Sequence, residues 1–78
     1  MARIGEFTEM LGGDGNVHGE VECGYKTFVV DGQTYLQLDT YGSEERKIQG
    51  KVSQSIQLDV TSAAYLMGVL RRTFPQIQ

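Results

Sequence analysis

The chain has 78 residues, a net charge of −3 and a pI of about 4.9. This length makes one small domain, residues 1–78, whose stability is marginal unless a disulfide, a metal or oligomerisation adds to it. The single cysteine excludes an intrachain disulfide, and one cysteine with one histidine cannot build a structural zinc site. Oligomerisation is the remaining addition, so we expect a homodimer. The acidic balance disfavours a general binder of polyanions.

Targeting features point to the cytoplasm. No apolar run approaches the ~20 residues that a membrane span requires. The segment from Met1 to Ile4 lacks the basic-then-apolar order of a secretory signal. Because a lone cysteine also favours a reducing compartment, we expect a cytoplasmic protein.

The first segment has two interpretations. Ile4, Phe7, Met10 and Leu11 fall at helical spacing before Gly12-Gly13, which predicts a short N-terminal helix ended by glycine. Residues 3–11 also alternate loosely, so an edge strand is the competing prediction. Residues 12–15 follow as a turn, since they lack the Lys-Ser/Thr ending of a phosphate loop.

The Asp31-Gly32 pair predicts a hairpin. It separates an alternating segment over 17–30 from a second one that ends at Tyr41. Asp-Gly between two strand patterns indicates a two-residue type I′ turn, which also sets the register. The pairs expected across the hairpin are Val30–Gln33, Val29–Thr34, Phe28–Tyr35, Thr27–Leu36 and Tyr25–Leu38.

This register divides the hairpin into two faces, because alternate residues of a strand point to opposite sides. One face is the expected core and holds Tyr25, Thr27, Val29, Leu36, Leu38 and Thr40. The other, which we call the aromatic face, holds Lys26, Phe28, Tyr35, Gln37 and Tyr41, with Asp39 among them. Aromatic rings on an open sheet suit stacking on single-stranded bases, or a dimer or partner surface, and they would be plain core if a second helix covered them. We expect a partner surface.

A third strand is predicted over 52–59, after a polar loop. The four residues Ile56-Gln-Leu-Asp59 repeat the pattern of Leu36-Gln-Leu-Asp39. We interpret this repeat as two adjacent antiparallel strands that meet the same packing demand.

The last element is predicted to be an amphipathic helix, capped by Asp59, Thr61 or Ser62 and ended by Pro75. Its apolar stripe consists of Ala63, Leu66, Met67, Leu70 and Phe74. The predicted fold is therefore α+β, in the order α-β-β-β-α: a three-stranded antiparallel meander sheet packed on a C-terminal helix, with a short N-terminal helix.

No catalytic constellation is found. His18, Glu20 and Glu22 share a strand face, but metal ligands normally converge from several elements, so we interpret them as a solvated face. Cys23 lies on the expected core face, where cysteine behaves as a small hydrophobe. We therefore predict no enzyme, no metal and no cofactor.

A local cluster of cations follows the hairpin. Cations with hydroxyl groups beside them are the usual makers of phosphate contacts. Glu44 and Glu45 precede the cluster and cancel much of its field, so a solvated hairpin connection is at least as good an interpretation. The residues available for phosphate are Arg46, Lys47, Lys51, Ser53 and Ser55.

Two resemblances bear on function. The α-β-β-β-α order resembles the double-stranded-RNA-binding domain in topology alone. That family grips phosphates with a lysine-rich start of its last helix, whereas residues 59–64 (DVTSAA) carry no cation, so we do not transfer the function. The motifs YLQLDTYGS (35–43) and GKVSQSIQLD (50–59) are similar to a group of small uncharacterised bacterial proteins. This likeness implies a compact bacterial or phage domain and supplies no activity.

The sequence thus favours a non-catalytic binding protein that acts through protein–protein contacts as a homodimer. The alternative is a nucleic-acid-binding accessory or regulatory domain that contacts phosphates through the 43–55 loop. No membrane and no small-molecule substrate is inferred.

Overall fold

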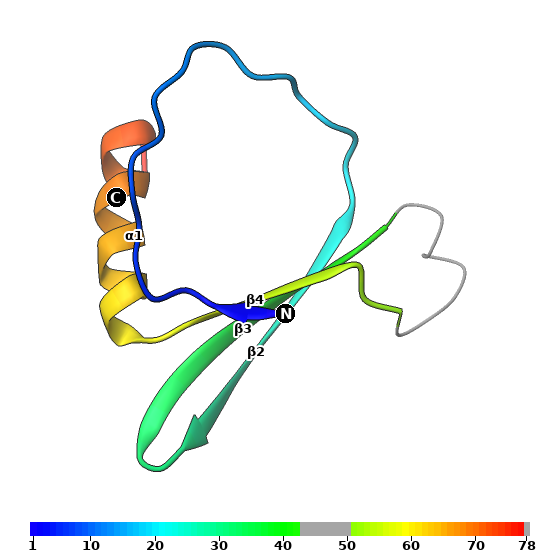
Figure 1. Ribbon diagram of the computed structural model, residues 1–78, viewed down its shortest axis with the longest axis vertical. Helices are drawn as coiled ribbons and strands as arrows, with labels where there is room; N and C mark the ends of the chain where they lie inside the picture. The colour runs from blue at the N-terminus through cyan, green and yellow to red at the C-terminus, as the bar shows by residue number, and fades with distance from the viewer. Residues whose placement is uncertain (43–50, 78) are drawn as a thin grey trace.

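The computed structural model describes residues 1–42 and 51–77 (Figure 1). Within these residues, four strands and one helix follow one another: β1 (Ala2–Arg3), β2 (Glu22–Val30), β3 (Gln33–Tyr41), β4 (Gln54–Leu58) and α1 (Val60–Thr73). The strands form one sheet in the order β1-β4-β3-β2. The pairs β2–β3 and β3–β4 are antiparallel, and β1 pairs with β4 in parallel.

The predicted fold class is wrong in two respects. The sheet is four-stranded and mixed rather than a three-stranded antiparallel meander, and no N-terminal helix forms. The class is still α+β, with one C-terminal helix. The fourth strand arises because Ala2 and Arg3 pair with Ile56 and Gln57, so the start of the chain adds a short parallel strand at the edge of the sheet.

The predicted hairpin is confirmed. All five expected pairs are present in the register of β2 and β3. Asp31 and Gly32 have φ angles of 51° and 76°, the left-handed values that a type I′ turn requires at both central positions. Glycine adopts such a φ without steric cost, and aspartate tolerates it better than most residues. The strand that precedes the turn begins at Glu22, five residues later than predicted.

The repeated pattern is confirmed as a pair of adjacent antiparallel strands. Gln37 lies directly opposite Gln57, and Leu36 and Leu38 lie opposite Leu58 and Ile56. Two copies of the same pattern that run in opposite directions place like residues against like residues. This pairing puts apolar side chains on one face of the sheet and polar ones on the other.

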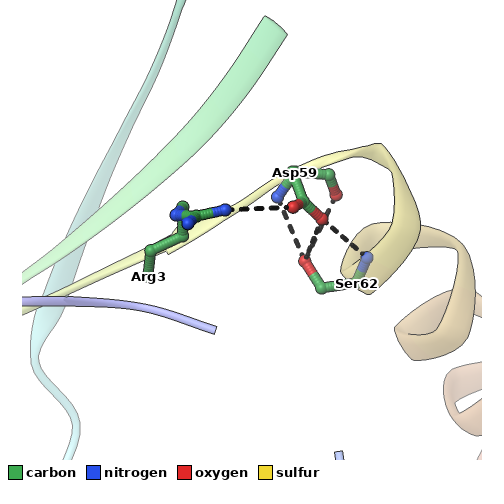
Figure 2. Close-up of polar contacts among 3 residues, drawn as sticks. All are labelled: Arg3, Asp59 and Ser62. Atoms are coloured by element: carbon green, nitrogen blue, oxygen red, sulfur yellow. Dashed lines mark hydrogen bonds and ion pairs between the residues drawn. The ribbon is translucent and has the colours of Figure 1, made fainter. Parts of the chain in front are cut away.

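A capping box starts α1. Figure 2 shows Asp59 between Arg3 and Ser62. The Ser62 backbone N–H donates to Asp59 Oδ1 at 2.9 Å, and the Asp59 N–H donates to Ser62 Oγ at 3.0 Å. Arg3 Nη1 lies 3.4 Å from Asp59 Oδ2. The hydrogen bonds from Ser62, with a smaller contribution from Arg3, lower the pKa of Asp59.

Replacing Ser62 with alanine should lower the thermal midpoint by about 4–8 °C, since one reciprocal cap bond is worth about 1 kcal/mol. The variant also removes the hydroxyl oxygen that accepts from the Asp59 N–H, at a position where Ser62 is buried. Thermal unfolding followed by far-UV circular dichroism measures the change. The exposed neighbour Thr61, changed to alanine, is the matched control, and an equal drop in both variants would contradict the capping role.

Residues 4–21, which we call the arm, lie outside helices and strands. Only Ile4 and Phe7 are half-buried in it: the Ile4 N–H donates to the Gln57 carbonyl at 2.9 Å, and Phe7 stacks on Tyr65 of α1 with ring centroids 5.4 Å apart. Figure 1 shows the arm passing beside α1, bowing away and returning to β2. The predicted helix fails because so short an apolar pattern cannot offset the cost of helix nucleation with the few contacts that Ile4 and Phe7 make.

Few apolar side chains are buried within the described residues. Leu58 is the one buried hydrophobic residue there, with 3% of its surface exposed. The expected core face is largely open, with Tyr25 79% and Val29 64% exposed. The radius of gyration is 14.7 Å, against about 11.5 Å for a compact chain of this length. The described part of the chain therefore leaves much of its own apolar surface exposed.

Candidate functional site

The aromatic face has an ordered centre. Phe28 and Tyr35 lie opposite each other on β2 and β3, and their rings stack with centroids 5.6 Å apart. Both side chains are half-buried. Lys26 lies opposite Gln37 one row further along the hairpin. All five side chains predicted for this surface thus share one face of the sheet.

Tyr41 lies over Gly24. A Cβ atom added at Gly24 would come within 3.3 Å of the Tyr41 hydroxyl oxygen, so the ring uses the space that glycine leaves. Together with Lys26, Gln37 and Asp39, these residues line a shallow hollow on the aromatic face. The hollow joins one cation, one carboxylate and one aromatic edge within a small area.

A chain of hydrogen bonds crosses this face from β4 to β3. Gln57 Nε2 donates to Gln37 Oε1 at 2.9 Å, and Gln37 Nε2 donates to Asp39 Oδ1 at 3.0 Å. Ser55 Oγ also donates to Asp39 Oδ1. Gln37 and Ser55 are only 7% and 8% exposed. Buried polar groups that are fully hydrogen-bonded hold a surface in one arrangement, because breaking any bond leaves a buried group unsatisfied.

The sequence contained one sign of this network. The repeated Gln-Leu-Asp pattern implies that Gln37 and Gln57 meet across antiparallel strands. The same alignment also places Ser55 opposite Asp39, a pair that the assignment of Ser55 to phosphate overlooked. Asp39 is the acceptor for both donors and the centre of the network.

The hydrogen bond from Ser55, then that from Gln37, lowers the pKa of Asp39, with a smaller contribution from Lys26. A carboxyl group whose folded pKa lies below its unfolded value stabilises the fold above the unfolded pKa. This contribution is lost as the pH falls through the folded pKa.

Acid should therefore destabilise the protein as the pH falls below about 4, the ordinary pKa of aspartate, and through the lowered folded pKa of Asp39, and Asp39→Asn should reduce that loss. The variant is expected to be less stable than the wild type near neutral pH and closer to it in acid. Urea unfolding midpoints across this range measure both effects. Asp14→Asn, in the exposed arm, is the matched control, and a pH profile of Asp39→Asn parallel to that of the wild type would contradict the assignment.

The residues proposed for phosphate are spread over different surroundings. Arg46 and Lys47 lie outside the described residues. Lys51 and Ser53 are exposed, and the Ser53 N–H donates to the Thr40 carbonyl at 2.8 Å. Ser55 is buried beside the Asp39 carboxylate, which would repel a phosphate.

The candidates for metal and thiol chemistry are dispersed as well. His18 and Glu20 lie in the exposed arm, and Glu22 begins β2. Within residues 1–42 and 51–77, no three His, Cys, Asp or Glu side chains lie close enough to hold a metal ion. Cys23 was expected in the core, but it is exposed on the open sheet face.

Comparison of the chain with protein-family models, with curated proteins and with solved structures finds no match. In the part of the chain that the structure describes, no helix combines the length and the hydrophobicity needed to cross a membrane.

Proposed function

We propose that this chain is a non-catalytic binding protein that acts through protein–protein contacts as a homodimer. The observation that carries the proposal is its exposed surface of 6997 Å². A compact chain of 8.7 kDa exposes about 4,700 Å². Part of the excess, roughly 2,300 Å², comes from the exposed arm, and part comes from apolar side chains of the sheet and α1, such as Tyr25, Val29 and Met67. Apolar side chains left uncovered on a sheet and a helix are typical of a chain that completes its core by association.

The aromatic face is the partner surface in this proposal. The Phe28–Tyr35 stack supplies aromatic area of the kind enriched in interface cores, and Lys26 supplies a cation at its side. The hydrogen-bond network on this face reduces the ordering cost of binding, since buried Gln37 is already fixed. The partner of this face is another protein or a second copy of the chain.

Sedimentation velocity between low- and high-micromolar concentration tests the association. The expected result is a species of twice the 8.7 kDa chain mass, in equilibrium with the monomer only at the lowest concentrations. A monomer throughout the range would overturn the proposal.

The competing partner class, nucleic acid, is tested by titrating labelled single- and double-stranded DNA and RNA at low salt and again near physiological salt. The proposal predicts no saturable binding. Saturable binding that weakens steeply with salt would contradict it and direct attention to Arg46, Lys47 and Lys51, because each lost phosphate contact lowers the salt slope by about one.

A further inference from the structure

Two apolar surfaces of this chain are left open within the described residues. The first is the face of the sheet opposite the aromatic face, which we call the open face; its members are Tyr25, Val29 and Ile56, which are exposed, and Leu36 and Leu38, which are half-buried. The second is the apolar stripe of α1, where Met67 and Leu70 are exposed at 48% and 38%. Each is the kind of surface that a small α+β domain normally buries against the other.

The arm does not cover the stripe. Phe7 stacks on Tyr65, and the hollow beside this pair is lined from the helix by Val69 and Arg72. At 3.6 residues per turn, the side of α1 that carries Tyr65 and Val69 lies roughly 150° around the helix from Met67 and Leu70. The arm therefore occupies one side of α1 and leaves the stripe on nearly the opposite side.

The helix meets the open face only at its start. An apolar groove at this junction is lined by Leu36 of β3, by Leu58 at the end of β4, and by Val60 and Ala63 in the first turn of α1. Beyond that turn the helix stands away from the sheet (Figure 1). The stripe residues further along, from Leu66 to Phe74, have no sheet beneath them.

We propose that a second copy of this chain closes both surfaces: the apolar stripe of α1 from one protomer packs on the open face of its partner, and reciprocally. This inference rests on the homodimer of the proposed function and assigns its interface. A two-fold axis satisfies both contacts at once, because the same pair of surfaces is used twice. The aromatic face is then left outward for a different protein.

The areas permit this assignment. The excess of roughly 2,300 Å² per chain includes the exposed arm, so roughly 4,600 Å² is the upper bound for two chains; obligate homodimers bury about 2,000–5,000 Å². Such interfaces resemble a domain core cut in half, and the open face and the stripe have that composition.

Mixing two single-cysteine variants tests the contact in the full chain. Both carry Cys23→Ser; one adds Tyr25→Cys on the open face, and the other adds Met67→Cys on the stripe. After the dimers have been dissociated, mixed and reassociated, a short bismaleimide should link Tyr25→Cys chains to Met67→Cys chains. Only an interchain contact gives this product, since neither chain holds both cysteines.

The matched control replaces Tyr25→Cys by Lys26→Cys, the adjacent position on the aromatic face, which should give little product. If the chain is dimeric but Lys26→Cys links and Tyr25→Cys does not, the interface assignment is wrong and the proposed homodimer stands. If sedimentation shows only monomer, both are wrong. A dimer without the Tyr25–Met67 product also overturns the assignment.

A second measurement avoids cysteines. Met67→Asp should weaken dimerisation at least about a hundredfold, because it buries an unpaired charge. Ala64→Asp, exposed about 100° around α1 from both the middle of the stripe and Tyr65, should change it less than about twofold. Equal effects of the two variants would contradict the proposal.

Discussion

Replacing Leu58 with alanine should lower the thermal midpoint by at least about 10 °C. Leu58 is the most completely buried hydrophobic residue among those the structure describes, and it lies where β4 meets α1. Truncating such a leucine costs about 2–5 kcal/mol through lost burial and the cavity left behind. A domain of this length has a total stability of about 4–12 kcal/mol, so the loss is a large share of it.

Leu58→Met is the control for this prediction, because it nearly conserves volume and should cost less than about 1.5 kcal/mol. Thermal and urea unfolding of both variants measure the difference. Similar midpoints for Leu58→Ala and wild type would show that the junction of β4 and α1 contributes little to stability.

Diluting the protein a hundredfold should lower its thermal midpoint by roughly 10 °C. A chain that completes its core by association unfolds and dissociates together, so its stability falls with protomer concentration. A hundredfold change in concentration corresponds to about 2.7 kcal/mol, which for a small dimer shifts the midpoint by roughly this amount.

Calorimetry at the higher concentrations and circular dichroism at the lower ones cover the range. Met67→Asp is the informative comparison, since a chain that cannot associate should have a low midpoint that does not depend on concentration. A concentration-independent midpoint in the wild type would mean that the monomer is stable by itself.

The elements that local rules determine were predictable. The turn at Asp31-Gly32 fixes its hairpin by backbone sterics, and that hairpin has the expected register. The cap at Asp59 and the stop before Pro75 fix the bounds of α1 in the same way, by hydrogen bonding and by loss of the helical conformation. Neither depends on what the rest of the chain does.

The elements that depend on packing were not predictable. The helical spacing of Ile4 and Phe7 could not show that the segment would lie along α1 without forming a helix of its own. Alternation correctly separated the two faces of the sheet, but no helix or strand among residues 1–42 and 51–77 covers the open face. The sequence pattern shows which side chains share a face of the sheet. Whether that face is buried depends on which other element packs against it.

The aromatic face illustrates the same limit. Its five residues follow from register alone, but the bond between Ser55 and Asp39 joins strands across the chain and changes the role expected for Ser55. A hydroxyl suggested for phosphate is instead a donor within the network. The residue type showed that Ser55 can donate a hydrogen bond, and its neighbour Asp39 determined which group accepts that bond.

The repeated Gln-Leu-Asp pattern also makes the strand alignment ambiguous. Sliding β4 along β3 by two residues would pair Leu38 with Leu58 and each glutamine with an aspartate, which keeps the apolar and polar faces intact. That alignment requires Asp59 to extend the strand, but in the structure Asp59 caps α1 through Ser62. The helix cap therefore favours the observed alignment of β4 on β3. It disfavours the alignment shifted by two residues, which hydrophobic patterning alone would permit.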